Sequence, residues 1–235
     1  MEETAYFLNL TTHTEKPVVL VGSMRPSTAV SADGPLNLYN GVAVAADPNA
    51  RNRGVLLVMN DWIHSAQTLT KVSTTAVQTF MSPIRGLIGT SAYGKNEYYR
   101  YPHNKYGAKS EFSTDGVTKL PRVDIIYADA DMPADLIDAS VQRGAKGIVI
   151  AGVGNGNMPK AALDACAAAS KKGVIVVRSS RVTTGNVDRN VEVNDDQLGL
   201  VASYDLNPQK ARILLSVALL KPRKLEEIQK LYYEY

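Results

Sequence analysis

The sequence predicts an α/β protein of two three-layer domains whose sheets are mainly parallel. The first observation is a strand followed by a helix: residues 18–21 read VVLV, and residues 36–46 have helical spacing after Pro35. The second is an alternation of strands and helices over residues 123–233, which is typical of a parallel sheet with right-handed crossovers. The third is the length of 235 residues, enough for one large or two small domains.

The first half is expected to start with a helix, because Glu2 and Glu3 favour a helix N-terminus. Three of the four residues in VVLV are β-branched, which suits a strand buried on both faces. The expected elements are a helix at 1–10, a strand at 18–21, a helix at 36–46, a strand at 54–59, short β segments within 60–80, and a hairpin of residues 86–93 and 97–101 around Gly94-Lys95-Asn96.

The second half is expected to be a compact domain at residues 122–235. Residues 102–121 are polar, bounded by prolines and without periodicity, so they are interpreted as a linker that follows an N-terminal domain at 1–101. Asn207 and Pro208 are typical of a helix start. The expected elements are strands at 123–127, 147–153 and 174–177, and helices at 134–143, 158–171, 207–219 and 225–233.

The composition excludes several classes of protein. The net charge is +3, from 26 basic and 23 acidic residues, and no basic run exceeds two residues, which argues against nucleic acid as the main partner. No apolar run approaches the roughly 20 residues of a membrane span. Met1 is followed by two glutamates, so no signal peptide is recognised.

Cysteine and histidine are scarce. Cys166 is the single cysteine, so no internal disulfide is expected, and its Ala-rich surroundings predict a buried small residue rather than a nucleophile. His13, His64 and His103 lie far apart in the sequence without metal-ligand spacing. We therefore expect neither a metal site nor a cofactor.

The loop between the first strand and its helix is a candidate ligand site. It reads SMRPSTAVSADG and follows a strand at the place where open α/β sheets bind ligands. Twelve residues are long for a βα connection, which usually has about two to six. The alternative is an ordinary connector.

The motif GVGNGN at residues 152–157 has three interpretations. It resembles a dinucleotide-binding loop, but Asn157 replaces the third glycine, and Arg178 stands where an acidic residue is expected. Glycines that let the backbone approach a small polar ligand, with the Asn157 amide beside it, fit the motif better. The third interpretation is a tight turn.

Lys71 and Glu192 are weak candidates on their own. Lys71 lies among hydroxyl residues in QTLTKVSTT and could take part in proton transfer, although a single lysine is usually a solvated surface residue. Glu192 alternates with Val191 and Val193 as on a short strand, where it would be a solvated edge residue.

Seven stretches carry a resemblance to a known family: MEETAYFL, VGSMRPSTAVSADGPLNLYN, GVLLVMND, TKVSTT, AGVGNGN, VRSSRV and DLNPQKAR. Together, and in this order, they resemble the bacterial type II L-asparaginase (glutaminase-asparaginase) family. The resemblance implies two α/β domains and a homotetramer built as a dimer of dimers. It also implies active sites between the N-terminal domain of one copy and the C-terminal domain of another.

The resemblance implies hydrolysis of the side-chain amide of L-asparagine, and often L-glutamine, through a threonine nucleophile and an acyl-enzyme. Lys71 matches the lysine of the family's proton relay. Ser23 matches the position whose main-chain carbonyl receives the substrate's amide nitrogen. Asn157 and Glu192 match the residues that a neighbouring copy provides to the substrate's α-amino end.

The sequence departs from the family pattern at its start. The family's nucleophile segment, of the Thr-Gly-Gly-Thr-Ile type, and its Gly-Thr-Asp-Thr segment are not found, and Thr183-Thr184-Gly185 does not replace them. We therefore expect a truncated chain whose nucleophile lies outside it. We also expect an exposed sheet edge beside residues 18–21, an uncovered helix face at Ala5 and Leu8, and aggregation or folding of the C-terminal domain alone.

Alternative functions stay open at this point. One alternative is an inactive, truncated asparaginase-like subunit, and another is an amino-acid-binding protein. A third, which fits the motifs less well, is a nucleotide-binding protein that uses GVGNGN. The family is typically periplasmic, but this sequence does not itself report localisation.

Overall fold

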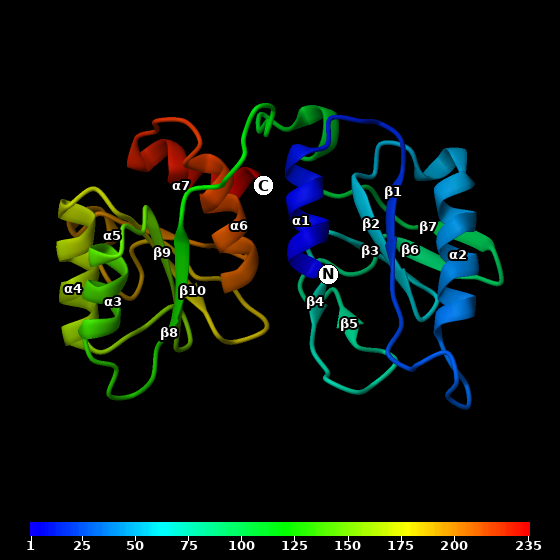
Figure 1. The fold of residues 1–235 in the computed structure, drawn as a ribbon, viewed down its shortest axis with the longest axis horizontal. Helices are drawn as coiled ribbons and strands as arrows, with labels where there is room; N and C mark the ends of the chain where they lie inside the picture. The colour runs from blue at the N-terminus through cyan, green and yellow to red at the C-terminus, as the bar shows by residue number, and fades with distance from the viewer. The chain divides into compact units, whose positions relative to one another are not determined.

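The computed structural model describes residues 1–235 and divides them into two compact units, unit 1 at Met1–Ser113 and unit 2 at Thr114–Tyr235 (Figure 1). The boundary lies inside the expected linker, whose first part belongs to unit 1 instead. Phe112 is 3% exposed and its carbonyl accepts a 2.7 Å hydrogen bond from His13 Nε2. Ser110 donates a hydrogen bond to the Leu10 carbonyl. None of the helices combines the length and apolar character that a membrane span requires.

The sheet of unit 1 has the strand order β1-β2-β3-β6-β7. Only β1 and β2 run parallel, and the other three pairs are antiparallel. The α/β class is confirmed, but this sheet is mixed rather than mainly parallel as expected. The strands are β1 (Val18–Val21), β2 (Val55–Met59), β3 (Trp62–Ser65), β6 (Gly89–Ala92) and β7 (Lys95–Tyr98), and a separate pair is formed by β4 (Thr70–Lys71) and β5 (Phe80–Met81).

Two helices, α1 (Glu2–Thr11) and α2 (Gly34–Ala46), cover opposite faces of this sheet. Successive side chains of β2 point to opposite faces of the sheet, as in any strand. Leu57 packs in the cluster that contains Ala5, and Leu56 packs in the cluster that contains Val44. The expectation of an uncovered face on α1 is wrong. Ala5 is 0% exposed and Leu8 packs against the same cluster, because β2 and the β5 residue Phe80 lie under this helix.

Strand β1 is one of the two edge strands of the sheet, which confirms the expected edge beside residues 18–21. Its burial on both faces was predicted wrongly. All four residues are only half-buried, because β2 pairs with one side of the strand and the described chain leaves its other side unpaired. A run of β-branched residues predicts a strand but not its place in the sheet. Aggregation through this edge stays a prediction.

The expected hairpin is present as β6 and β7, but its turn is one residue earlier than predicted. Tyr93 and Gly94 connect the strands with φ values of 51° and 77°, and Lys95 already pairs with Ala92. A two-residue hairpin connection of this kind requires a positive φ at both positions, and Gly94 adopts it without strain. The 3₁₀ turns Pro48–Ala50 (η1) and Gly107–Lys109 (η2) were not predicted.

Unit 2 is a three-layer α/β domain, as predicted. Its sheet has the order β11-β10-β9-β8 with every pair parallel. Helices α3 and α4 share a core with one face, and α6 and α7 cover the other (Figure 1). The elements are β8 (Val123–Tyr127), α3 (Asp135–Gln142), β9 (Gly147–Gly152), α4 (Lys160–Lys171), β10 (Ile175–Ser180), α5 (Asp195–Leu198), β11 (Leu200–Ala202), α6 (Pro208–Ala218) and α7 (Leu225–Glu234).

The start of α6 confirms the predicted cap. The Asn207 side chain accepts a 3.1 Å hydrogen bond from the Lys210 backbone N–H, and Pro208 occupies the first helical position. Helix α5 and strand β11 were not predicted, because four and three residues are too few for a periodic pattern. Gly199 joins them with a φ of 69°, in the left-handed region.

Candidate functional site

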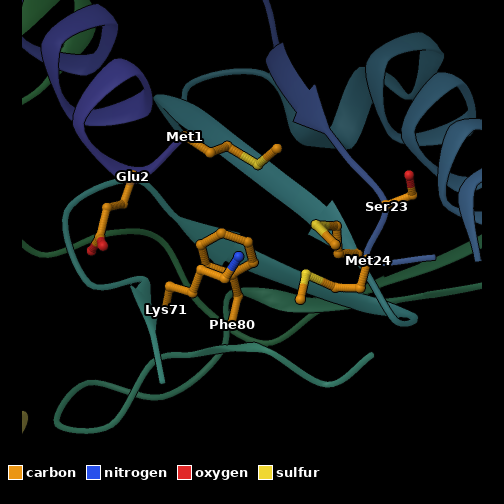
Figure 2. Close-up of a pocket in the computed structure, with 7 residues that line it drawn as sticks. Met1, Glu2, Ser23, Met24, Lys71 and Phe80 are labelled. Atoms are coloured by element: carbon orange, nitrogen blue, oxygen red, sulfur yellow. The ribbon is translucent and has the colours of Figure 1, made fainter. Parts of the chain in front are cut away.

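A cavity in unit 1 brings Lys71 and Ser23 together. It has a volume of about 150 Å³ and lies between the start of α1, the segment after β1 and the β4–β5 pair. Figure 2 shows Lys71 and Phe80 on one side and Ser23 with Met24 on the other. The complete lining is Met1, Glu2, Ser23, Met24, Met59, Lys71 and Phe80.

Lys71 reaches this cavity from a very short strand. It pairs with Phe80 in the two-residue antiparallel ladder between β4 and β5. The residue is exposed, as the solvated-surface interpretation predicts, yet it lines the cavity. Phe80 is 6% exposed and belongs to the core under α1, so the ladder connects Lys71 to a packed part of unit 1.

The long loop after β1 is held by one carboxylate. Asp33 accepts hydrogen bonds from the backbone N–H groups of Met24, at 3.0 and 3.1 Å, and of Arg25, at 2.9 Å. Partial burial by itself raises the pKa of Asp33, but these backbone donors and the Asn37 amide outweigh it, so the pKa lies below its usual value. The ionised carboxylate therefore fixes the chain immediately after Ser23.

Asn37 fixes the residue immediately before Ser23 in the same loop. The residue is 3% exposed, and its Nδ2 donates to the Gly22 carbonyl at 2.9 Å. Its Oδ1 accepts from the Asn60 backbone N–H at 2.9 Å, which joins the loop after β1 to the turn after β2. Ser23 thus lies between two anchored neighbours, Gly22 and Met24, while its own side chain is exposed.

In unit 2, Asn157 closes a tight turn after β9. Val153 and Asn157 exchange two backbone hydrogen bonds of 2.8 Å. Gly154 and Gly156 have φ values of 53° and 77°. A Cβ on Gly152 would lie 2.5 Å from the Gly156 carbonyl carbon, so this position requires glycine. The turn therefore fixes the backbone of Asn157.

Glu192 lies in a second loop, between β10 and α5, and is exposed. The short strand expected around it is wrong: residues 191–193 form a bend, since no neighbouring strand pairs with them. The two loops of unit 2 touch, because Asn155 Oδ1 accepts a 2.7 Å hydrogen bond from the Asp188 backbone N–H. The structure thus connects the turn of Asn157 with the loop of Glu192.

Two family models match the chain: "Asparaginase, N-terminal" over residues 1–104 and "Glutaminase/Asparaginase C-terminal domain" over residues 122–232. A "Probable L-asparaginase periplasmic" from Haemophilus influenzae is 51% identical over 235 residues, covering 100% of this chain and 67% of that protein. The chain belongs to the asparaginase family. The resemblance inferred from its motifs is confirmed at this level.

Two further relatives support the same assignment of this asparaginase-family chain. "L-asparaginase 2" from Escherichia coli is 50% identical over 238 residues, covering 100% of this chain and 68% of that protein. A "Glutaminase-asparaginase" from Acinetobacter glutaminasificans is 45% identical over 238 residues, covering 100% of this chain and 72% of that protein. The chain thus spans about two thirds of the length of these relatives.

The GVGNGN motif of this family member is built as a tight turn. In a dinucleotide-binding loop the glycines lead directly into a helix. Here α4 begins at Lys160, after the turn has already closed on itself between Val153 and Asn157. The turn interpretation is therefore confirmed, and it is compatible with a small polar ligand at Asn157.

Cys166 is buried in unit 2, as predicted. It is 0% exposed in the core between α4 and the sheet, with Sγ 3.7 Å from Met158 Sδ. Burial raises the pKa of its thiol to about 12, which keeps it protonated at neutral pH.

Sequence reasoning missed the residues that hold the loops. Asp33 and Asn37 were not singled out, although an Asp before a helix is a known loop anchor. Arg178 was noticed only as the residue that replaces an expected acid. Its signal was a charge near the middle of an apolar strand, and its partner Asp195 lies 17 residues later.

Proposed function

We propose that this chain carries most of an amidohydrolase that converts L-asparagine, and also L-glutamine, into the corresponding acid and ammonia. The observation that carries the proposal is a cavity that contains both Lys71 and Ser23, in a chain 50% identical to the L-asparaginase 2 of Escherichia coli. Neither residue was recognisable as functional by composition or spacing alone.

In unit 1, Lys71 is proposed to take part in proton transfer. An ammonium or amine at the cavity wall can give or receive the proton that the departing ammonia requires. The Ser23 main-chain carbonyl is proposed to accept a hydrogen bond from the substrate's amide nitrogen. Support comes from the anchoring of both neighbours of Ser23, by Asn37 and Asp33, which holds this carbonyl in one orientation.

In unit 2, Asn157 and Glu192 are proposed to bind the α-amino end of the substrate. A carboxylate and an amide oxygen are suitable acceptors for an ammonium group. The contact between their loops at Asn155 and Asp188 supports a common site. We propose that these residues complete the site of a neighbouring copy in a tetramer assembled as a dimer of dimers.

The nucleophile is proposed to be a threonine outside residues 1–235. Its hydroxyl attacks the amide carbon, ammonia leaves, and water hydrolyses the acyl-enzyme to the free acid and the regenerated threonine. Backbone N–H groups stabilise the oxyanion in each tetrahedral step. A periplasmic location is proposed as well, because the Haemophilus influenzae relative is named as periplasmic.

One observation favours a second candidate function, amino-acid binding without turnover. None of the residues that line the cavity is a threonine, and Ser23 is their single hydroxyl residue. In this case the chain would bind L-asparagine or L-aspartate but would not release ammonia.

Ammonia release tests the proposal. A segment with the family's Thr-Gly-Gly-Thr-Ile and Gly-Thr-Asp-Thr types of motif is fused ahead of Met1, and L-asparagine turnover is measured for the chain and the fusion. We expect activity in the fusion only, and a decrease of about 10²–10⁴-fold for Lys71→Met within it. Lys95→Met, an exposed lysine on β7, is the control and should change nothing. A fully active Lys71→Met fusion would contradict the role of this lysine.

A further inference from the structure

We propose that Arg178 and Asp195 are the positioning residues of the unit 2 site: as one buried ion pair, they hold both the turn of Asn157 and the loop of Glu192. The proposal rests on the proposed function for the roles of Asn157 and Glu192. The holding of the two loops is an independent structural claim.

The pair is completely buried. The side chain of Arg178, on β10, is 1% exposed and that of Asp195, at the start of α5, is 0% exposed. Nε lies 2.7 Å from Oδ1 and Nη2 lies 2.8 Å from Oδ2, which is a bidentate arrangement. The planar guanidinium fork matches a carboxylate in this geometry, which the point charge of a lysine cannot reproduce.

The guanidinium also reaches both loops. Nη1 donates to the Asn155 carbonyl at 2.9 Å, two residues before Asn157. Nη2 donates to the Asp188 carbonyl at 3.2 Å, in the loop that leads to Glu192. One side chain, fixed on a central strand of the sheet, therefore sets the positions of both loops.

Asp195 adds a contact on the second loop. Its Oδ2 accepts a 2.8 Å hydrogen bond from the backbone N–H of Asn190, two residues before Glu192. Asn190 has a φ of 58°, in the left-handed region that non-glycine residues rarely adopt. The carboxylate thus fixes a left-handed backbone conformation two residues before Glu192.

The glycines of GVGNGN fit this interpretation. A Cβ on Gly156 would lie 3.0 Å from Arg178 Nη1 and 2.8 Å from a methyl group of Val187. The turn therefore lies directly on the guanidinium and on Val187 of the second loop. A motif that resembles a phosphate-binding loop instead lets a backbone pack on a buried arginine.

Arg178 acts through other residues and does not itself bind a ligand. Each of its three guanidinium nitrogens already donates to a protein oxygen, and the side chain is closed off from solvent. Its effect on substrate binding must therefore pass through the positions of Asn157 and Glu192.

The test removes both charges together. A single substitution leaves an uncompensated buried charge and risks unfolding, whereas apolar replacement of a whole buried pair is often tolerated. The variant is Arg178→Met/Asp195→Leu in the chain of residues 1–235. The matched control is Arg122→Gln/Asp124→Asn, a pair with a 2.8 Å contact whose side chains are 46% and 25% exposed, at the opposite end of the sheet, where β8 begins.

Two readouts are measured: amide hydrogen exchange of residues 152–157 and 188–192, and the affinity for L-aspartate by titration calorimetry. We expect the double variant to unfold cooperatively, to exchange at least about tenfold faster in both segments, and to bind L-aspartate at least about tenfold more weakly. The control variant should match the parent in both measurements.

Other outcomes overturn specific parts of the account. Parent-like exchange in a folded double variant would contradict the positioning role, and so would loosened loops with unchanged affinity. If the double variant does not fold, Arg178→Lys is measured instead, because it keeps the charge but loses the bidentate fork. Faster exchange in both segments with weaker L-aspartate binding would support the positioning role, and parent-like values would contradict it. A parent chain that does not bind L-aspartate would contradict the second candidate function, amino-acid binding by residues 1–235, while the exchange data would still decide whether the pair holds the loops.

Discussion

The two units hold their candidate site residues in different ways. In unit 1, a partly exposed carboxylate, Asp33, fixes the loop after Ser23, and Lys71 stands on a two-residue strand. In unit 2, the ion pair of Arg178 and Asp195 is completely buried beneath the loops of Asn157 and Glu192. Both arrangements fix loops that follow parallel strands. The unfolding free energy that is lost with each anchor should therefore depend on how deeply that anchor is buried.

The largest effect is expected from Arg178→Met alone. It leaves the Asp195 carboxylate buried without a partner, which typically lowers the free energy of unfolding by about 3–5 kcal/mol. Urea denaturation followed by the far-UV signal measures this change. Arg122→Met, which breaks an ion pair with partly exposed side chains, should cost much less unfolding free energy. Equal losses of unfolding free energy in the two variants would contradict the claim that burial sets the cost of breaking an ion pair.

A smaller effect is expected from crowding the turn of Asn157. Gly152→Ala places a Cβ 2.5 Å from the Gly156 carbonyl carbon and 2.8 Å from the Asn157 carbonyl oxygen. Overpacking of this kind costs about 1–3 kcal/mol of unfolding free energy. It should also weaken L-aspartate binding, because the Asn157 backbone must move.

Gly154→Ala is the control within the same turn. Nothing lies within 4 Å of the added Cβ, so its cost comes only from a φ of 53° and should be about 1 kcal/mol. If Gly154→Ala weakens L-aspartate binding more than Gly152→Ala does, steric pressure on Asn157 is not the cause.

The anchor of unit 1 should respond to pH. The pKa of Asp33 is lower in the folded chain than in the unfolded chain. The ionised carboxylate therefore stabilises the fold above the unfolded-chain pKa of about 3.9, and this stabilisation is lost as the pH falls through the folded-state pKa. Asp33→Asn should lower the unfolding free energy at pH 7 by about 1 kcal/mol, since solvent screens the partly exposed group.

The measurement is a pair of stability curves from pH 7 to the acid limit. The difference between the parent and Asp33→Asn should shrink below about pH 4 and disappear once Asp33 is protonated. A difference that stays constant over this range would show that packing, rather than the ionised carboxylate, holds the loop after β1.

The smallest effect concerns Cys166, which reports on the core of unit 2 without disturbing it. At pH 8 a thiol whose pKa is raised to about 12 is almost entirely protonated, and the side chain is buried. A maleimide should label it only after urea unfolds the domain, as mass spectrometry can follow. Rapid labelling of the native chain would mean that the core between α4 and the sheet opens readily.

Local patterns predicted most of the fold. The apolar runs of β2, β8 and β9 and the Asn207-Pro208 start of α6 carry their signal within a few residues. The burial of β1 was not predictable in this way, because it depends on which strands pair with it. Strand β11 and helix α5 were missed because their pairing partners, not their own three or four residues, define them.

The site was less predictable than the fold. Lys71 and Glu192 look like ordinary solvated residues, and only the resemblance to a family singled them out. Arg178 and Asp195 are 17 residues apart and meet only after β10 and α5 have formed. No local pattern contains such a contact, which explains why an arginine within a strand was interpreted as a missing acid.

Lys71 of one copy and Glu192 of another are proposed to serve the same substrate, and mixed oligomers distinguish this arrangement from a site within one copy. Fusions that carry Lys71→Met and Glu192→Gln, each inactive alone, are co-expressed, and ammonia release from L-asparagine is measured. If sites form between copies, random pairing restores roughly a quarter of the parent activity, because one site in each mixed dimer has both native residues. No activity above that of the separate variants would contradict a shared site.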